Sequence, residues 1–356
     1  MTGDRLGLEQ FSLRELPIPD LKPGQALVRV KLINIHSGTR WRMAVGSTEL
    51  GATDRTNYAC AEVIHSRDPV FKEGDVVACQ AGWQEYQVIS SEDASVGYGP
   101  PSALVKTLNR TNSQWTYVFR PAMVEMWPPE VLMEMFGTSG MTAYFGTREC
   151  GPLMPRDRVA VAAASGSVGS IAAQLARIAG CHVVGFAGGA DRCGWVREAL
   201  RIQRCIDYKA HDFPQQLKAA FPEGIDVFCD GVGGALTQTV MPLVNDHGRL
   251  FSYGGAAGLY ADTLSHERPP LRRTFGISDA VETLLQQRNI KSEAWIVDSF
   301  YHERLEAEDD LSRHLLSGAL KPVTHVVEGF EALPQAIVSL YATPRAGKLQ
   351  VRFAGR

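Results

Sequence analysis

The sequence predicts an α/β protein in two parts, a small β-rich domain and a doubly wound parallel sheet. The chain has 356 residues, which is longer than one hydrophobic core usually organises. Up to residue 89 it contains short β-branched or alternating runs that turn formers separate. From Pro128 onward, strand-like and helical segments alternate, and this is the pattern of a parallel sheet covered by helices.

The amino-terminal part reads as a barrel-like domain. Strands are expected within 24–35, 60–66 and 75–89, because these runs are rich in β-branched and alternating apolar residues. Lys-Pro-Gly at 22–24 and Lys-Glu-Gly-Asp at 72–75 supply the turns. Residues 91–118 mix Ser, Gly, Pro and Asn with scattered aromatics, so a long surface excursion beside a cleft is expected there.

The second part alternates between the two kinds of element. Helices are expected within 128–150, where Gly137 and Gly140 interrupt them. The remaining pattern predicts strands at 158–164, 181–188, 205–208, 225–230 and 248–255, with helices at 168–180 and 191–200. Residues 323–353 read as strand, helix and strand, a terminal hairpin-like element that returns to the first domain.

Composition excludes several classes of function. A formal charge of -3 gives no basic field for nucleic acid phosphates. No segment approaches the roughly 20 apolar residues of a membrane span, and the amino terminus lacks the apolar core of a signal peptide, so a cytoplasmic protein is expected. Seven cysteines without a C-x-x-C pair argue against disulfide frameworks and zinc lobes, and indicate reduced structural thiols.

A glycine-spaced turn within "VAVAAASGSVGS" is the main functional signal. Ala164 to Gly169 have the spacing A-x-G-x-x-G, the dinucleotide fingerprint with alanine at its first position. Gly166 lets the backbone approach a pyrophosphate, and Gly169 lets the helix pack closely on the strand. Small residues also suit a plain strand-to-helix corner, but the strand before the turn and the helix and strand after it favour a cofactor site.

The charge at the end of the next strand indicates whether the cofactor is NADH or NADPH. An NAD enzyme usually places an acid there for the ribose hydroxyls, whereas "VGFAGG" at 184–189 holds none before Asp191. Arg192 follows and is suited to pair with a 2'-phosphate, which favours NADPH. The alternative is a solvated arginine at a helix start, with Asp191 neutralising part of its charge.

With these residues placed, the chain resembles the zinc-independent medium-chain dehydrogenase/reductase superfamily, most closely its leukotriene B4 dehydrogenase/prostaglandin reductase and alkenal double-bond reductase branch. The resemblance runs nearly end to end, and its specific pieces include "GWQEY", "GTSGMTAYFG", "EGIDVFCDGVGG", "VVEGFEALPQAI" and "GKLQV". It implies a GroES-like barrel domain at 1–127 and 321–356, a Rossmann domain at 128–320, a cleft between them, NADPH as cofactor and a homodimer.

The same resemblance implies residue roles. The nicotinamide surroundings are expected at Thr142, at Gly254 to Tyr260 and at Trp295 to Val297. The implied cofactor contacts are Thr142, Gly166, Ser167, Val168, Gly169, Arg192, Tyr208, Gly231, Gly254, Gly255, Trp295, Ile296, Val297 and Arg345, and the implied substrate pocket holds His36, Arg40 and Tyr58.

The implied chemistry is hydride transfer from NADPH to the β-carbon of an α,β-unsaturated carbonyl, followed by protonation at the α-carbon. Tyr260 matches the tyrosine that donates a hydrogen bond to the developing enolate oxygen; the alternative is a packed aromatic at a loop end. No metal is expected, because the histidines lack the zinc branch's G-H-E pattern. His36 is a second candidate proton donor, although a structural role is the simpler interpretation.

Several departures from the resemblance crowd the cleft. "NIHSGTR" at 34–40 stands where the family carries a D-P-Y-M-R pattern, Gly231 and Arg345 stand at asparagine positions, and Ala261 replaces the asparagine after Tyr260. The predicted function is therefore reduction of a conjugated C=C bond in a small-molecule carbonyl. Quinone reduction, a non-redox cyclase or lyase that keeps NADP(H), and a cofactor-holding protein without activity remain as alternatives.

Overall fold

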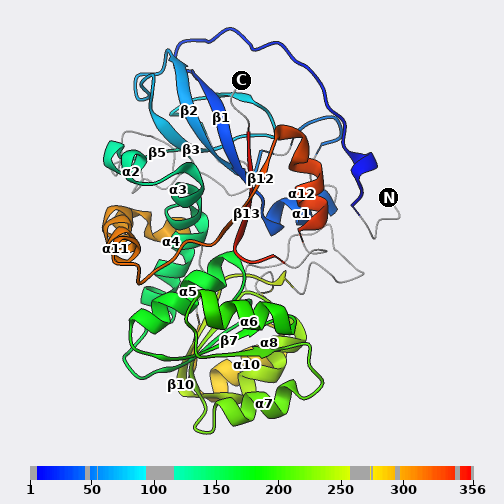
Figure 1. Ribbon diagram of the computed structural model, residues 1–356, viewed down its shortest axis with the longest axis vertical. Helices are drawn as coiled ribbons and strands as arrows, with labels where there is room; N and C mark the ends of the chain where they lie inside the picture. Colours follow the sequence, from blue (N-terminus) through cyan, green and yellow to red (C-terminus); the bar gives the residue numbers. More distant parts are fainter. Residues whose placement is uncertain are drawn as a thin grey trace.

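The computed structural model describes residues 6–44, 49–53, 55–93, 116–256, 273, 276–292, 297–340 and 345–353. Within these residues the chain forms two sheets, the first in the upper and the second in the lower half of Figure 1. The architecture is the predicted one, with a β-rich part followed by an α/β part built on a parallel sheet.

Seven described strands form the first sheet: β1 Ala26–Asn34, β2 Tyr58–Ser66, β3 Val76–Gln80, β4 Tyr86–Ile89, β5 Tyr117–Val118, β12 Thr324–Glu328 and β13 Lys348–Arg352. Their order is β12-β13-β1-β2-β3-β5, and β4 also pairs with β1. The antiparallel pairing of β13 with β1 confirms that the end of the chain returns to the first sheet. The domain limits at 127/128 and 320/321 remain a prediction.

The hairpin-like reading of the terminal segment is wrong. β12 and β13 pair in parallel, and α12 (Leu333–Ser339) connects them. Parallel neighbours need a crossover connection, whereas a hairpin turn joins only antiparallel strands. The predicted excursion at 91–118 falls largely outside the described residues.

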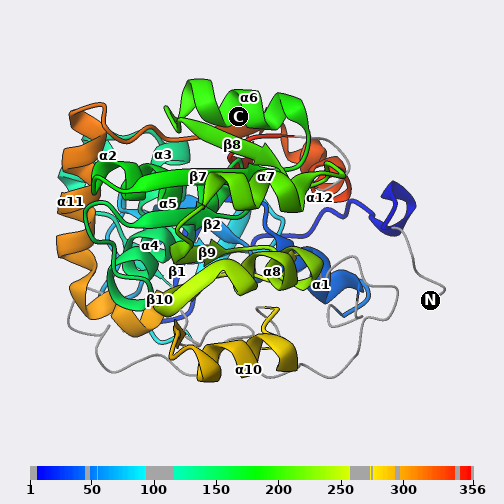
Figure 2. The ribbon, with the colours of Figure 1, turned by 90° about the horizontal axis from the view of Figure 1, so that it is seen from below.

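Six described strands form the second sheet: β6 Arg158–Val161, β7 His182–Ala187, β8 Arg204–Asp207, β9 Ile225–Asp230, β10 Val244–Ser252 and β11 Lys291–Ser292. They are parallel, in the order β11-β10-β9-β6-β7-β8, and Figure 2 shows this order from β8 at the top to β10 below. β6 is shorter than the expected strand at 158–164, because the chain turns at Ala162 to form the glycine turn.

The other α-helices in the described residues are α1 Ser37–Ala44, α2 Pro121–Met126, α3 Pro129–Met135, α4 Thr138–Phe145, α5 Ser167–Ile178, α6 Ala190–Ala199, α7 Phe213–Ala220, α8 Gly234–Val240, α10 Asp279–Gln287 and α11 Arg304–Leu316.

Helices cover both faces of the second sheet. Val159 and Val161 of β6 pack into a core with α4, α5, α6 and α11. Ala160 faces the opposite core with α7, α8 and α10, because successive strand side chains point to opposite faces.

Gly137 separates α3 from α4, as predicted, but Gly140 does not interrupt a helix. Gly140 lies within α4, and a Cβ at this position would lie 1.9 Å from the carbonyl oxygen of Met135. The glycine therefore permits the close approach of α4 to the end of α3.

Candidate active site

The glycine turn has the geometry that a pyrophosphate site needs. It joins β6 to α5, and Ala163 within it has a positive φ of 50°. A Cβ on Gly169 would lie 2.3 Å from the Ala163 carbonyl oxygen, so only glycine lets α5 approach the turn this closely. A Cβ on Gly166 would lie 3.1 Å from the same oxygen. The first-turn amides, at Ser167 to Gly169, belong to the part of an α-helix without intrahelical partners, where anions bind.

The adenosine side of the site surrounds the turn between β7 and α6. Gly189 precedes α6 with φ 102°, and its amide donates to Asp207 Oδ1 over 2.8 Å. Arg192 lies in the first turn of α6, and its Nε is buried without a hydrogen-bond partner among the described residues. Tyr208 completes the group, because its hydroxyl oxygen lies 3.1 Å from where a Cβ on Gly188 would be. The structure thus brings Arg192 and Tyr208 to the same turn.

Two residues of this turn were not predicted. Asp207 ends β8 and holds the Gly189 amide, and its Oδ1 also accepts from the Lys209 amide over 2.9 Å. The Lys209 Cε lies 3.0 Å from where a Cβ on Gly188 would be, which puts a second cation near this turn. The sequence feature that could have indicated them is "DYK" at 207–209, at the end of β8. The bond between Asp207 and Gly189 depends, however, on β7 and β8 being neighbours in the sheet.

The turns after β9 and β10 gather three of the predicted cofactor residues. A Cβ on Gly254 would lie 3.1 Å from the Gly231 carbonyl oxygen, and a Cβ on Gly233 would lie 3.5 Å from the Gly255 Cα. Asp230, at the end of β9, is buried and accepts from the amides of Val232 and Gly233. Burial raises the pKa of the Asp230 carboxyl, against the hydrogen bonds that lower it. The two turns therefore pack closely against each other at these glycines.

The returning terminal segment touches the glycine turn. Gly347 forms an isolated bridge with Gly166, and Arg345 precedes it by two residues. The Arg345 Nη1 contacts His325 Nε2, and burial together with this positive charge lowers the pKa of His325. Arg345 is therefore two residues from the point where the chain touches the glycine turn, but its guanidinium is hydrogen-bonded to His325.

The predicted substrate residues lie after β1 and at the start of β2. His36 Nε2 is 3.1 Å from the Thr56 carbonyl oxygen and 3.5 Å from Thr39 Oγ1. Thr39 is fully buried, and its hydroxyl also contacts the Thr56 hydroxyl at 3.4 Å. Arg40 Nη1 is buried without a hydrogen-bond partner in the described part of the chain. His36 thus joins a threonine cluster, and Arg40 keeps an unpaired donor.

Thr142 and Val297 lie on elements that contact each other, α4 and the short helical turn Val297–Glu303. Val297 is buried in the core that also contains Phe145 and Tyr301. Tyr58 starts β2 and packs partly buried against the same core. Tyr260, Trp295 and Ile296 lie outside the described residues.

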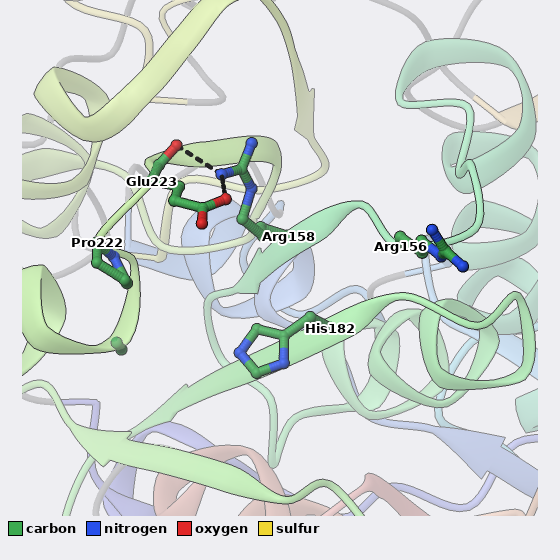
Figure 3. Close-up of a pocket in the computed structure, with 6 residues that line it drawn as sticks. Arg156, Arg158, His182, Pro222 and Glu223 are labelled. Atoms are coloured by element: carbon green, nitrogen blue, oxygen red, sulfur yellow. Dashed lines mark hydrogen bonds and ion pairs between the residues drawn. The ribbon is translucent and has the colours of Figure 1, made fainter.

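A hollow at the other end of the second sheet is a separate feature. Arg156, Arg158 and His182 line it with Pro222 and Glu223 (Figure 3). Arg158 and His182 are the first residues of β6 and β7, so this hollow lies at the amino edge, opposite the glycine turn. Glu223 and Asp226 both pair with Arg158 at 2.8 Å, which neutralises the guanidinium. The hollow is not the candidate active site.

Metal ligands do not cluster in the described part of the chain, where no three His, Cys, Asp or Glu side chains could together hold an ion. All seven cysteines are free. Burial raises the pKa of Cys60 and of Cys79 to about 12, so these thiols stay protonated. None of the helices searched is long and apolar enough to cross a membrane.

The chemistry of the strand-end donors fits a phosphorylated dinucleotide. The buried, unpartnered atoms include Arg192 Nε and Ser167 Oγ, and both lie at helix starts on the carboxyl edge of the sheet. Gly166 and Gly169 supply a cradle that side chains would fill. These features match one negatively charged group at the α5 terminus and a second near Arg192.

Comparisons with known proteins match both parts of the chain to oxidoreductases. Residues 4–96 match the family model described as the N-terminal domain of oxidoreductase, and residues 167–286 match that of zinc-binding dehydrogenase. The chain is 28% identical to NADPH-dependent curcumin reductase of Escherichia coli over 98% of this chain and 93% of the relative. It is 29% identical to a 2-alkenal reductase (NADP(+)-dependent) of Nicotiana tabacum over 82% of this chain and 75% of the relative.

Among solved structures, CurA of Vibrio vulnificus in complex with NADPH superposes with a TM-score of 0.79, at 26% identity, over 99% of this chain and 97% of that chain. The likeness covers both sheets and their connections. The two family models and these relatives support a place for the chain in the zinc-independent medium-chain dehydrogenase/reductase family, in its prostaglandin reductase and alkenal reductase branch.

Proposed function

We propose that this protein is an NADPH-dependent reductase that transfers a hydride to the β-carbon of an α,β-unsaturated carbonyl compound. The observation that carries the proposal is Arg192, whose buried Nε has no partner among the described residues and follows a strand end with no acid of its own before Asp191. The relatives named above are NADPH- or NADP-dependent by their descriptions, and they act on curcumin and on 2-alkenals. A 2'-phosphate is the group that the charge and position of Arg192 suit.

The chain's own residues bind and orient the cofactor, which supplies the hydride when bound. The amides of Ser167, Val168 and Gly169 hold the pyrophosphate, and Gly166 lets it approach the backbone. Arg192 and Tyr208 hold the 2'-phosphate side, with Lys209 adding positive charge. The residues that would hold the nicotinamide half are Thr142, Gly231, Gly254, Gly255, Trp295, Ile296, Val297 and Arg345.

The residues on the substrate side polarise the acceptor carbonyl. Tyr260 donates a hydrogen bond to the carbonyl oxygen, where negative charge develops as the hydride arrives at the β-carbon. His36, Arg40 and Tyr58 line the pocket for the acceptor. Because Arg40 Nη1 is buried and has no partner within the described part of the chain, it is suited to donate to a polar group on the acceptor.

Purified protein mixed with NADPH and a panel of enones, enals and quinones tests the function. We expect the near-ultraviolet absorbance of reduced nicotinamide to disappear with enones and enals, and product analysis to find the saturated carbonyl. Reduction of quinones alone would replace the proposed substrate class. Tight NADPH binding without oxidation by any acceptor would leave a cofactor-holding protein or a non-redox enzyme.

Tyr260→Phe tests the role of that hydroxyl. Removing one donor to a developing oxyanion lowers kcat by on the order of 100-fold in well-studied enzymes, so a large loss of kcat with little change in the NADPH dissociation constant is expected. Tyr86→Phe is the matched control, because Tyr86 is exposed on β4. Unchanged turnover in Tyr260→Phe would remove Tyr260 from the catalytic role.

We also propose a homodimer in the cytoplasm. The short strand β11 ends one side of the second sheet, and an edge strand is a common place for two sheets to join. Light scattering on the purified protein tests the dimer, and fractionation of cells that express it tests the location. A monomer at micromolar concentration would contradict the proposed assembly.

A further inference from the structure

Three neighbouring strands of the second sheet end in a row. β6, β9 and β10 are followed by Ala162, Gly231 and Tyr253, each the first residue beyond its strand. Backbone hydrogen bonds keep the row in register, because the Ala162 amide donates to Cys229 over 2.8 Å and the Tyr253 amide donates to Asp230 over 2.9 Å. Tyr253 therefore starts two strands away from the glycine turn.

The Tyr253 side chain crosses the row. Its hydroxyl donates to the carbonyl oxygen of Ala162 over 2.7 Å, so the ring extends from the end of β10 across β9 to the end of β6. Ala162 is the residue with which the glycine turn begins. The hydroxyl thus fixes the start of the turn on which the α5 amides depend.

Gly231 makes this path possible. A Cβ at this position would lie 2.3 Å from Tyr253 Cε2 and 2.8 Å from Cζ, so the ring occupies the space that any other residue would need. Phe251 supports the ring, with 5.0 Å between the two ring centroids and an angle of 43° between their planes. Gly231 and Tyr253 are therefore complementary in size.

The place that the ring crosses is where a doubly wound sheet binds its ligand. The chain leaves β6 toward β7 and β8 on one side, whereas β9 and β10 lie on the other, so the topological switch point falls between β6 and β9. Ligands of such sheets bind in the crevice outside the carboxyl ends of the strands at this point. Tyr253 lies across that crevice.

We propose that Tyr253 is a positioning residue for the dinucleotide, with Gly231 as the residue that gives it room. Its ring forms the floor of the crevice between β9 and β6, and its hydroxyl holds the glycine turn in the shape that grips the pyrophosphate. The inference rests on the proposed cofactor, but not on the proposed acceptor. The floor supports parts that NADPH and NADH share, whereas Arg192 recognises the 2'-phosphate alone.

Tyr253→Phe tests the hydroxyl, because it keeps the ring and removes the bond to Ala162. We expect the dissociation constants of NADPH and NADH to rise by the same factor, about 5-fold, which is the effect of one lost hydrogen bond. Titration by calorimetry measures both constants without any acceptor. Thermal unfolding of the cofactor-free protein gives the structural effect of the same change.

Tyr144→Phe is the matched control. The Tyr144 hydroxyl also donates to the protein, to Asp310 over 2.6 Å, but its acceptor lies on α11 and not in the glycine turn. We expect its loss to leave both dissociation constants unchanged. If Tyr253→Phe lowers the unfolding temperature and leaves both constants at the wild-type values, Tyr253 is only structural and the proposal is overturned.

Gly231→Ala tests the room for the ring. Its Cβ must displace Tyr253, so we expect a loss of affinity for both nucleotides of about 10-fold or more. In the double variant Gly231→Ala with Tyr253→Leu, the ring is absent and the alanine is expected to add nothing to the effect of Tyr253→Leu alone. Additive losses would overturn the size relationship.

The outcomes separate this inference from the proposed function. If the wild-type protein binds NADPH but reduces no acceptor, the proposed function fails while the comparison of dissociation constants still decides the role of Tyr253. If the protein reduces enones and Tyr253→Phe binds both nucleotides as the wild type does, the function stands and the inference fails. A wild-type protein that binds neither nucleotide overturns both.

Discussion

The amide of Gly347 donates a hydrogen bond to the carbonyl oxygen of Ser165 over 2.8 Å. This bond joins the segment that leads into β13 of the first sheet to the glycine turn of the second sheet. On the other side of Gly347, a Cβ would lie 2.0 Å from the Val323 carbonyl oxygen. The chain thus passes between Val323 and Ser165 where only a glycine fits, and the glycine turn is fixed by both sheets.

Gly347→Ala should therefore lower both stability and cofactor affinity. The substitution places a Cβ against backbone at φ 77°, and each effect costs on the order of 1 to 3 kcal/mol. Gly318→Ala is the control, because Gly318 has a similar φ of 69° and open space around it. We expect a clearly larger fall in unfolding temperature for Gly347→Ala. Equal falls would mean that the passage beside Val323 adjusts without cost.

Arg192→Ala should weaken NADPH binding much more than NADH binding. A charge-assisted hydrogen bond contributes about 1.5 to 3 kcal/mol, which corresponds to a loss of affinity for NADPH of about 10- to 100-fold. Arg197→Ala is the matched control, because Arg197 lies exposed near the end of the same helix. Isothermal titration with both nucleotides measures the effect. Equal losses for NADPH and NADH would reject the assignment of Arg192 to the 2'-phosphate.

Periodicity predicted most of the strands, because burial on one or both faces leaves a direct pattern in the sequence. The strands at 225–230 and 181–188 were placed within a residue or two of β9 and β7. The helices α7, α8, α10 and α11 were not predicted, because helices of only seven to 13 residues leave a weak periodic signal. The pairing partner of β12 depends on a crossover that composition does not reveal.

The candidate site was also predicted only in part. The glycine turn and Arg192 follow from a local motif, and both lie at helix starts, of α5 and of α6. Asp207 and Tyr253 act across strands, and their partners are far away in the sequence. Such contacts require the lateral order of the strands, which a single sequence does not supply. Tyr253 falls within the expected strand at 248–255, and nothing in the local sequence marks its bond to Ala162.

A buried carboxyl near the returning segment predicts a dependence of stability on pH. Glu134 on α3 is fully buried, and its Oε2 accepts from the Val323 amide over 2.8 Å. Burial raises the pKa of Glu134 to about 8, although the Val323 amide and the charge of Lys348 oppose the shift. Burial also lowers the pKa of Lys348 to about 8. Burial thus favours the neutral forms of both Glu134 and Lys348.

The direction in which stability changes with pH depends on whether the folded or the unfolded protein binds more protons. Between pH 4.5, the ordinary pKa of a glutamate, and about pH 8, the folded protein keeps the Glu134 proton that the unfolded chain releases. The stability associated with Glu134 is therefore complete below pH 4.5 and is lost as pH rises toward 8. Glu134→Gln keeps an oxygen for the Val323 amide and has no proton to lose, so it should be more stable than the wild type at pH 8.

Denaturant unfolding between pH 5 and pH 8 measures this difference. We expect the two proteins to have similar stabilities at pH 5 and to differ by on the order of a few kcal/mol at pH 8. Glu125→Gln is the control, because Glu125 is exposed on α2 and its removal should leave the pH profile of the wild type unchanged. If Glu134→Gln follows the wild-type profile in parallel, Glu134 is ionised in the folded protein. Its charge is then held by Lys348, and the buried pair is ionic.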